Sequence, residues 1–299
     1  MLRERVSGIA IFKLPERPYG RGACDRSGQV MSSILDVYQA TDGAAYEVFL
    51  GRRSRRLAEK LLDFAAFADD GALLDVGCGT GSLTGAMAAR WPQRRIVGVD
   101  FSEAFLEFAR SRELGKAVVF EHGDATALPY ADATFAGAAT QLVLNFIPDC
   151  DAAVAEMRRV TRRDSIVAAA VLDFRGGAVF QRLFWDTACG IDPQAHDRRA
   201  RLFSAKPALP GGLRGLFAAA GLAQIEEDLI TFRMDYLNFE DYWRPLLGGQ
   251  GPVGSYVAAL ASDLRERIET AVRAAYCAGA SDGPRAMSAT AWAVRGIVP

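Results

Sequence analysis

The pattern of hydrophobic and polar residues changes its period several times along the chain. Over residues 46–68 apolar side chains recur at helical spacing, with Leu57, Leu61 and Leu62 on one face. Residues 72–76 then form a short, continuous apolar run, which is typical of a strand buried on both faces. We therefore expect a helix followed by an inner strand of a parallel sheet.

Helical and strand-like segments alternate from this point to residue 172. The pattern predicts helices over residues 82–90, 102–112 and 151–162, and strands over residues 95–99, 117–121, within 133–143, and 165–172. Strands that alternate with helices of about ten residues indicate βαβ units and a parallel sheet. The predicted fold class is therefore α/β.

The alternation stops after Asp173. Residues 174–207 are rich in aromatic and arginine residues and show no clear strand pattern, so we expect a helical insertion there. The remaining pattern predicts a sheet-packing helix over residues 210–220, strands over 222–236 and 286–298, and a second insertion over 237–283 with one amphipathic helix near 256–276.

The first thirty residues have a different character. They hold prolines, glycines and mixed charges without periodicity, which predicts a flexible arm. Met31 opens the regular pattern and is an alternative start of translation. We therefore expect an arm over residues 1–30 and one domain over 31–299, enlarged by cap insertions at about 174–207 and 237–283.

Charge and composition exclude several classes of protein. The 35 basic and 36 acidic side chains give a net charge of −1, which provides no general attraction to nucleic acid or to an anionic membrane. The uncharged run at residues 133–148 is shorter than the ~20 apolar residues that span a bilayer, so we expect no membrane insertion. The N-terminus shows no signal-peptide cleavage site.

The cysteines and histidines indicate the compartment and argue against a metal site. Five scattered cysteines without a C-x-x-C pair are not typical of a disulfide framework or of zinc binding, and His122 and His196 are the only histidines. We therefore expect no metal, and a cytoplasmic location, where thiols stay reduced.

The candidate chemistry begins where the strand predicted at 72–76 ends. Gly77, Gly79 and Gly81 follow it at every second position, and a predicted helix comes next. Glycine lets a ligand approach the backbone closely, and the helix N-terminus offers free N–H groups. This spacing differs from the G-x-G-x-x-G pattern of dinucleotide-binding proteins.

Carboxylates follow at the ends of the next two predicted strands. Asp100 ends the second strand, nineteen residues beyond Gly81, and Gly123-Asp124-Ala125 follows the third. Each acid taken alone is also compatible with an ordinary turn or helix cap. However, the carboxyl ends of parallel strands converge on one crevice, where a carboxylate can accept hydrogen bonds from ribose hydroxyls.

These residues together resemble a known family. The run Asp75-Val76-Gly77-Cys78-Gly79-Thr80-Gly81, with Asp100 and Gly123-Asp124-Ala125, is similar to class I S-adenosylmethionine-dependent methyltransferases, and in particular to the methyltransferase type 11 group that includes the ubiquinone and menaquinone biosynthesis C-methyltransferases. The resemblance covers residues 45–175. It implies a Rossmann-like sheet of seven strands, mostly parallel with an antiparallel last strand, and S-adenosyl-L-methionine as cofactor.

The resemblance also implies roles for single residues. The glycine backbone with Asp75 behind it would hold the methionine part of the cofactor, Asp100 the ribose, and Phe101, Asp124 and Ala125 the adenine. The implied cofactor-binding residues are Arg52, Asp75, Gly77, Gly79, Gly81, Asp100, Phe101, Gly123, Asp124, Ala125, Gln141 and Leu142. Arg52 and Tyr46 would close over the cofactor, or else form a solvated helix start and a packed ring.

Two departures from the family pattern bear on the acceptor. The N/D-P-P-Y/F motif of DNA amino-methyltransferases is replaced by Gln141-Leu142-Val143-Leu144-Asn145-Phe146, which together with the neutral charge argues against nucleic acid. Asn145 stands where many relatives carry histidine. Any general base must come from elsewhere, and His196 is either that base or an ordinary surface or packing residue.

The aromatic residues of the two insertions have two interpretations. Trp185, Trp243, Tyr242 and Arg175 either line an acceptor pocket or belong to a separate small core. The predicted function is in-line transfer of a methyl group to a small or medium-sized, apolar metabolite. An NAD-linked oxidoreductase and a non-catalytic, cofactor-binding protein are the alternatives. The acceptor, the methylated element and the oligomeric state stay open.

Overall fold

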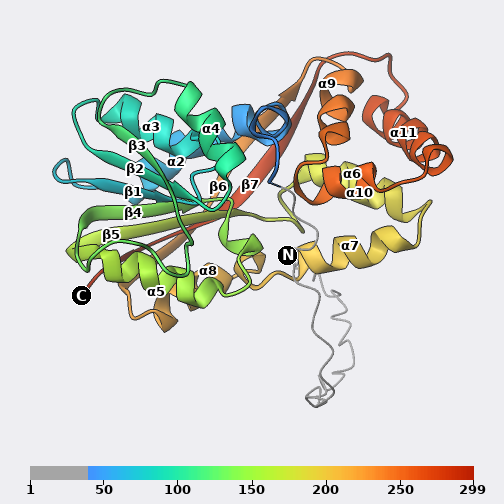
Figure 1. Cartoon of the computed structure of the whole chain (residues 1–299). Coiled ribbons are helices and arrows are strands. Elements are labelled where there is room, and N and C mark those ends of the chain that lie inside the picture. Colours follow the sequence, from blue (N-terminus) through green and yellow to red (C-terminus); the bar gives the residue numbers. More distant parts are fainter. Residues whose placement is uncertain (1–39) are drawn as a thin grey trace, which may run out of the picture. The chain divides into compact units, whose positions relative to one another are not determined.

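The computed structural model describes residues 40–299, which belong to one compact unit. The predicted arm over residues 1–30 and the alternative start at Met31 lie outside the described residues. The described chain is built around a seven-stranded sheet in the order β3-β2-β1-β4-β5-β7-β6 (Figure 1).

The strands follow the predicted pattern closely. The seven strands are β1 (Leu73–Val76), β2 (Ile96–Asp100), β3 (Val118–His122), β4 (Phe135–Gln141), β5 (Thr161–Leu172), β6 (Ala223–Tyr236) and β7 (Arg285–Ile297). The first five pair in parallel, whereas β7 runs antiparallel to both β5 and β6. This arrangement confirms the predicted fold class.

The order of the strands creates a crevice beside β1. The chain moves from β1 outward to β2 and β3, then returns to add β4 on the opposite side of β1. At such a reversal the connections leave in opposite directions, and ligands of open α/β sheets bind outside the carboxyl ends of the strands there. The topology thus predicts a site between the ends of β1 and β4.

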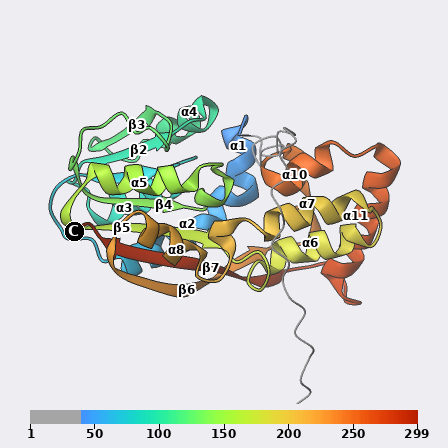
Figure 2. The ribbon, with the colours of Figure 1, turned by 90° about the horizontal axis from the view of Figure 1, so that it is seen from below.

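Helices cover both faces of the sheet. Figures 1 and 2 show α2 (Arg52–Ala65), α3 (Ser82–Arg90) and α4 (Glu103–Ser111) on one face, and α5 (Cys150–Val160) and α8 (Gly212–Ala219) on the other. The apolar stripe of α2, which includes Leu57, Leu61 and Leu62, is buried against the sheet and α3. Burial of this stripe is what fixes α2 in place.

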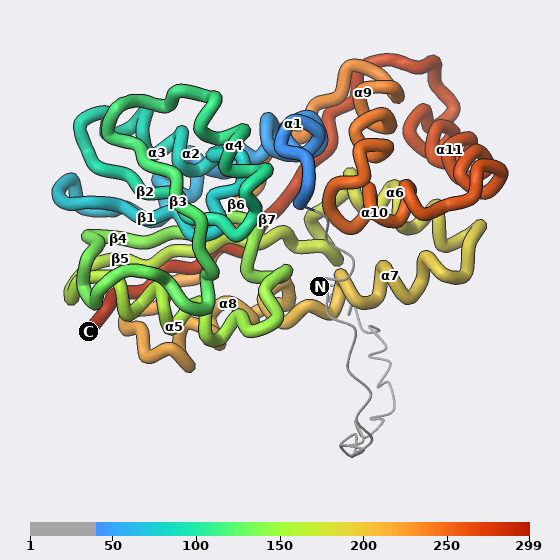
Figure 3. Tube along the Cα trace, in the orientation of Figure 1, coloured from blue at the N-terminus to red at the C-terminus, as the bar shows by residue number. Residues whose placement is uncertain are grey.

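Seven of the other helices form a second group, which we call the cap, whereas η3 (Leu144–Phe146) follows β4. The cap consists of α6 (Val179–Cys189), α7 (Gln194–Phe203), η4 (Lys206–Ala208), α9 (Phe239–Trp243), η5 (Arg244–Gly248), α10 (Gly251–Ala258) and α11 (Ser262–Cys277). The long strands β6 and β7 run from the sheet toward these helices (Figure 3). Within the cap, α6 packs against α7, α10 and α11.

Two predicted helices are wrong in detail. The helix predicted over residues 46–68 consists of three elements, α1 (Gly43–Tyr46), the π-helical turn η2 (Glu47–Gly51) and α2. It ends at Ala65, because the next residue, Ala66, is left-handed with φ of 52°. The helix predicted near 256–276 is divided between α10 and α11, because the backbone turns extended at Ala261.

No helix of residues 40–299 has both the length and the apolar character needed to cross a membrane.

Candidate functional site

A cavity of about 450 Å³ lies at the carboxyl ends of β1, β2, β3 and β4, as the topology predicts. We call it the cofactor cavity. It brings together most of the cofactor-binding residues predicted from the sequence, namely Gly77, Gly79, Asp100, Phe101, Gly123, Asp124, Ala125, Gln141 and Leu142.

The glycine loop after β1 forms one wall of this cavity. Gly77 has φ of +70°, and a Cβ atom there would lie 2.6 Å from both γ-carbons of Val143. The Gly77 and Cys78 N–H groups donate to the Val99 carbonyl at 2.8 and 3.0 Å, which ties the loop to β2. Glycine is required at position 77 because any side chain would be both strained and crowded.

Asp100, the last residue of β2, lines the cofactor cavity. Its Oδ2 accepts a hydrogen bond of 2.8 Å from the Gly79 N–H, and its Oδ1 accepts one of 2.9 Å from the Ser102 N–H. Burial raises the pKa of Asp100, and the two backbone donors partly oppose that shift. A carboxylate has about four acceptor sites, so this fixed group can still accept hydrogen bonds from a ligand.

Asp75 and Gly81 lie behind the loop rather than on the cavity surface. Asp75 Oδ2 accepts a hydrogen bond of 2.6 Å from the Thr84 hydroxyl, while its Oδ1 has no partner among the described residues. Burial raises the pKa of Asp75 to about 7. Gly81 adopts φ of +79° and is the N-cap of α3. Both residues therefore determine the shape of the loop.

The tips of β2 and β3 supply the opposite wall. Phe101 is 56 % exposed although its ring is large and apolar. Asp124 Oδ1 accepts hydrogen bonds of 2.8 Å from both the N–H and the hydroxyl of Thr126. An exposed ring beside a carboxylate held in a local turn is suited to stack on and hydrogen-bond a heteroaromatic base.

The end of β4 forms the floor. Gln141 donates from Nε2 to the Ser54 carbonyl at 3.2 Å, and its Oε1 is buried without a partner in the described part of the chain. Leu142 has φ of 63°, in the left-handed region that is unfavourable for a leucine. Strained residues of this kind cluster at functional sites.

Residues 40–53, which we call the strap, connect the cofactor cavity to the cap. Toward the cavity, the Tyr46 ring packs on Phe105 with centroids 4.8 Å apart, and Thr80 donates to Glu47 at 3.0 Å. Toward the cap, the Thr41 N–H donates to Gln250 Oε1 at 3.3 Å. The strap thus contacts both parts of the structure.

Arg52 lies apart from the cofactor cavity. Its guanidinium forms an ion pair with Asp241 of α9, it is 42 % exposed, and it lines a different surface hollow together with Val48 and Arg244. Tyr46, by contrast, does line the cofactor cavity.

The candidate residues of the insertions are not brought to the cofactor cavity either. His196 is exposed on α7, and Arg175 donates to the Phe203 carbonyl. Trp185, Trp243 and Tyr242 are buried in a cluster of aromatic rings inside the cap. The structure therefore supports the separate-core interpretation for Trp185 and Trp243, whereas Tyr242 also lines a second cavity, which lies between the strap and the cap.

The cavity also contains residues that the sequence interpretation did not assign. These are Val99, Phe105, His122, Thr126, Val143, Phe146, Ile147, Pro148 and Asp149. His122 directly precedes the predicted Gly123-Asp124 pair, so its position at a strand tip was the available signal. Residues 143–149 carry no such signal, because their place depends on how the chain turns after β4.

Over the described residues, no group of three or more His, Cys, Asp or Glu side chains is arranged to hold a metal ion. Cys78, Cys150, Cys189 and Cys277 have free thiols.

Comparison with known proteins identifies the family. A family model described as a methyltransferase domain matches residues 73–164. A demethylmenaquinone methyltransferase of Roseiflexus castenholzii is 32 % identical over 173 residues, which cover 54 % of this chain and 71 % of the relative. A malonyl-[acyl-carrier protein] O-methyltransferase of Geobacter sulfurreducens is 28 % identical over 191 residues, covering 60 % of this chain and 68 % of the relative.

Solved structures share the fold at low sequence identity. The YcgJ protein of Bacillus subtilis matches with a TM-score of 0.51 and 18 % identity, over 81 % of this chain and 97 % of that one. Phosphoethanolamine N-methyltransferase 2 of Haemonchus contortus, solved in complex with S-adenosyl-L-methionine, matches with a TM-score of 0.55 and 15 % identity, over 91 % and 61 %.

The sheet order, the glycine loop and the acid at the end of β2 define the class, and the relatives define the group within it. The chain belongs to the class I S-adenosylmethionine-dependent methyltransferases, in the group of the ubiquinone and menaquinone biosynthesis methyltransferases. It is an enzyme, and its cofactor is S-adenosylmethionine. The oxidoreductase and non-catalytic alternatives are thereby set aside.

Proposed function

We propose that this enzyme transfers the methyl group of S-adenosylmethionine, bound in the cofactor cavity, to a small or medium-sized, apolar metabolite. The observation that carries the proposal is the convergence of the glycine loop, Asp100 and Gln141 on one cavity at the topological switch point. The names of the relatives point to different acceptors, whereas the cofactor cavity of this chain is also lined by the apolar residues Val143, Phe146 and Ile147, which favour an apolar acceptor.

The cofactor would be held by the residues predicted from the sequence. Gly77, Gly79 and Gly81 would offer backbone to its methionine part, Asp100 would bind the ribose hydroxyls, and Phe101 would stack on the adenine. The remaining members of the set are Asp75, Gly123, Asp124, Ala125, Gln141 and Leu142. The cavity volume and the positive φ of the three glycines fit a ligand that lies directly on the backbone.

Arg52 enters this proposal as a positioning residue. Its ion pair with Asp241 ties the strap to the cap, and the strap presents Tyr46 to the cofactor cavity. Loss of the Arg52 side chain would therefore affect the cofactor through the strap.

The chemistry requires alignment more than proton transfer. The bound cofactor supplies a methyl group on a sulfonium, so the acceptor atom forms a bond to that carbon while the carbon–sulfur bond breaks and S-adenosylhomocysteine is released. Alignment of two reactants alone can supply up to ~11 kcal/mol of the barrier. The residues of the loop and of β4 would provide this alignment, and a base is needed only for an acceptor that loses a proton.

Calorimetry on the full chain tests cofactor binding. We expect S-adenosylmethionine and S-adenosylhomocysteine to bind, and Asp100→Ala to weaken both at least about tenfold, because hydrogen bonds to a charged group contribute ~1.5–3 kcal/mol. Asp263→Ala, which removes an exposed acid from α11, is the matched control and should bind normally. No heat of binding for the unaltered chain would refute the proposal.

The acceptor can be found by incubating metabolite extracts with isotopically labelled cofactor. We expect mass spectrometry to detect a neutral, apolar product that contains one labelled methyl group. Transfer only to nucleic acid or to a highly charged metabolite would contradict the proposed acceptor class.

We also propose that residues 31–299 form the methyltransferase domain, with cap insertions at about 174–207 and 237–283, and that the arm over residues 1–30 is dispensable. The helices α6 and α7, and α9 to α11, lie within these two ranges. A chain that begins at Met31 should keep the full affinity for S-adenosylhomocysteine. We place the enzyme in the cytoplasm, a proposal supported by the free thiols of the described cysteines and testable by cell fractionation.

A further inference from the structure

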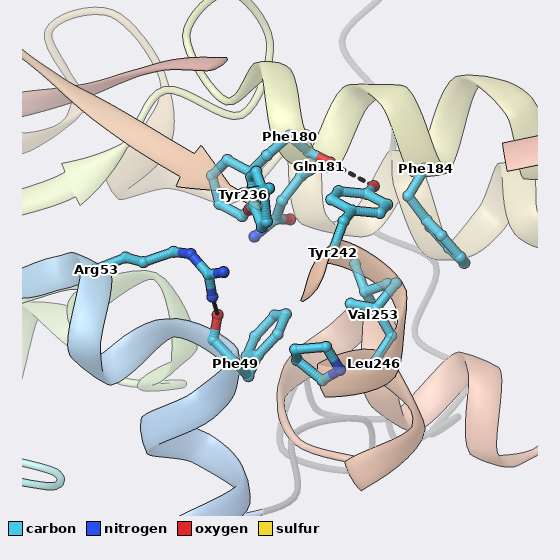
Figure 4. Close-up of a pocket in the computed structure, with 10 residues that line it drawn as sticks. Phe49, Arg53, Phe180, Gln181, Phe184, Tyr236, Tyr242, Leu246 and Val253 are labelled. Atoms are coloured by element: carbon cyan, nitrogen blue, oxygen red, sulfur yellow. Dashed lines mark hydrogen bonds between the residues drawn. The ribbon is translucent and has the colours of Figure 1, made fainter. Parts of the chain in front are cut away.

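A second cavity lies between the strap and the cap (Figure 4). Aromatic rings make up half of its lining, namely Phe49 of the strap, Phe180 and Phe184 of α6, Tyr236 of β6 and Tyr242 of α9. Its volume of about 10 Å³ gives room for one water molecule in the structure as it stands. We call it the cap cavity.

The cap cavity and the cofactor cavity share the strap and the start of α2 as a common wall. Tyr46 lines the cofactor cavity, whereas Phe49, one helical turn later, lines the cap cavity. Arg53 lines the cap cavity, and the carbonyl of the next residue, Ser54, accepts a hydrogen bond from Gln141 on the floor of the cofactor cavity.

This wall contains an irregular turn. The π-helical turn η2 occupies residues 47–51, so it begins directly after Tyr46 and includes Phe49. Turns of this kind are rare and are frequently found at functional sites. The wall is therefore the segment that we expect to rearrange when a ligand larger than water enters the cap cavity.

The charged side chain that lines the cap cavity, Arg53, already has a hydrogen-bond acceptor for each of its N–H groups. Arg53 is the one charged residue among the described residues that line it, and its five N–H groups donate to carbonyls of residues 48, 49, 235 and 241 and to the Asp241 carboxylate, at 2.9–3.4 Å. Its guanidinium also lies 4.3 Å from the centroid of the Tyr236 ring. With its donors used and its charge paired, Arg53 offers no site to an anionic ligand.

Gln181 differs from Arg53, because one polar atom of its side chain has no hydrogen-bond partner in the described part of the chain. Its side chain is 5 % exposed and lines the cap cavity, and its Oε1 has no hydrogen-bond partner within residues 40–299. Figure 4 shows it directed into the space between Tyr236 and Tyr242. The Tyr242 hydroxyl does not satisfy it, because that hydroxyl donates to the Phe180 carbonyl at 2.8 Å. A buried amide oxygen without a partner is costly, so a hydrogen-bond donor, either a water or a group of a ligand, is expected at this oxygen.

We propose that Gln181 is a specificity-determining residue for the methyl acceptor. The apolar part of the acceptor occupies the cap cavity, and a hydroxyl or N–H group of the acceptor donates a hydrogen bond to Gln181. The acceptor is therefore neutral and has a hydroxyl or N–H group, which is a hydrogen-bond donor, near its apolar part. This inference rests on the proposed function, because it takes the ligand of the cap cavity to be the molecule that is methylated.

Small probes test the proposed hydrogen bond without knowledge of the acceptor. The full chain, saturated with S-adenosylhomocysteine, is titrated with phenol, anisole and benzoate and followed by NMR. We expect phenol to bind about tenfold more tightly than anisole, which lacks the donor, and benzoate to bind more weakly than either. Gln181→Leu should abolish the advantage of phenol and leave anisole unchanged.

Gln194→Leu is the matched control, since it makes the same substitution at an exposed position of the cap helix α7. It should keep the preference for phenol. Equal affinities for phenol and anisole in the unaltered chain, or a preference for phenol that survives in Gln181→Leu, would overturn the inference.

Stability gives a second, independent measurement. If the Gln181 oxygen is unsatisfied until an acceptor binds, Gln181→Leu should unfold at a higher temperature than the unaltered chain and bind S-adenosylhomocysteine with the same affinity. A lower unfolding temperature would mean that Gln181 holds a structural water, and the inference would fail. Failure of the unaltered chain to bind S-adenosylhomocysteine would instead refute the proposed function, so the two failures are distinguishable.

Discussion

Asp75 illustrates how one buried side chain can serve both the fold and the site. It holds α3 through the Thr84 hydroxyl and lies directly before the glycine loop, yet one of its oxygens has no partner in the described chain. Burial raises its pKa to about 7, and burial also raises the pKa of Asp100. Both acids therefore take up a proton more readily in the folded state than in the unfolded chain.

This shift makes stability depend on pH. An aspartate in the unfolded chain has a pKa near ~3.9, so between about pH 4 and pH 7 the folded state binds more protons. The contribution of Asp75 to stability is therefore fully present below about pH 4 and is lost as the pH rises through about 7. Urea unfolding at pH 5, 6, 7 and 8 should show this decline, and Asp75→Asn should reduce its slope. An unchanged slope in Asp75→Asn would contradict the assignment.

Gly77 allows a second prediction at the scale of one residue. Gly77→Ala adds both left-handed strain and a contact of 2.6 Å with Val143, whereas Gly211→Ala has a similar φ of +72° and no atom within 4 Å. We expect Gly211→Ala to cost about 1 kcal/mol of unfolding free energy and Gly77→Ala about 2–4 kcal/mol. Only Gly77→Ala should also weaken S-adenosylhomocysteine binding. Equal effects of the two substitutions in denaturant unfolding and calorimetry would refute the role of crowding.

The strap is the element that joins cofactor cavity and cap. Arg52 and Arg53 are adjacent, and both bind Asp241, but Arg53 is 6 % exposed and Arg52 is 42 % exposed. Burial lowers the pKa of Arg53. The two arginines therefore provide a test in which the ion-pair partner is shared, whereas burial and the hydrogen bonds that go with it differ.

We expect Arg53→Ala to cost about 3–5 kcal/mol of unfolding free energy, because it removes a buried charge with five hydrogen bonds. Arg52→Ala should cost under about 1 kcal/mol, as exposed ion pairs do. Urea unfolding of both variants measures the difference. Similar losses for the two variants would show that burial of Arg53 is not what stabilises the strap.

Most elements can be predicted from the sequence, and the failures have local causes. The helix over residues 82–90 has its predicted bounds, because its apolar spacing and the preceding glycine are both local signals. The division between α10 and α11 is missed, because residues 259–261 are alanine and leucine, which favour helix. Both helices pack on α6, so tertiary contacts accompany a break that local propensity does not predict.

At the scale of the whole molecule, cofactor binding should stabilise the fold. A ligand that binds only the folded state at 100 times its dissociation constant adds ~2.7 kcal/mol. For a chain of 299 residues that corresponds to a rise of roughly 4 °C in unfolding temperature. Differential scanning fluorimetry with S-adenosylhomocysteine measures it, with adenosine triphosphate as a control ligand that should have little effect. No rise with S-adenosylhomocysteine would contradict binding to the folded cofactor cavity.

The sequence by itself determined the α/β class, the glycine loop and the acids at the strand tips. These follow from local periodicity, and parallel topology then brings the carboxyl ends of the strands together. Only the tertiary structure decided which of two adjacent arginines is buried and that Gln181 faces a cavity. The Arg53–Asp241 contact joins residues 188 positions apart, and no local pattern specifies such a contact. The arrangement of the cap therefore cannot be predicted from the sequence alone, because its residues are positioned by packing between distant segments.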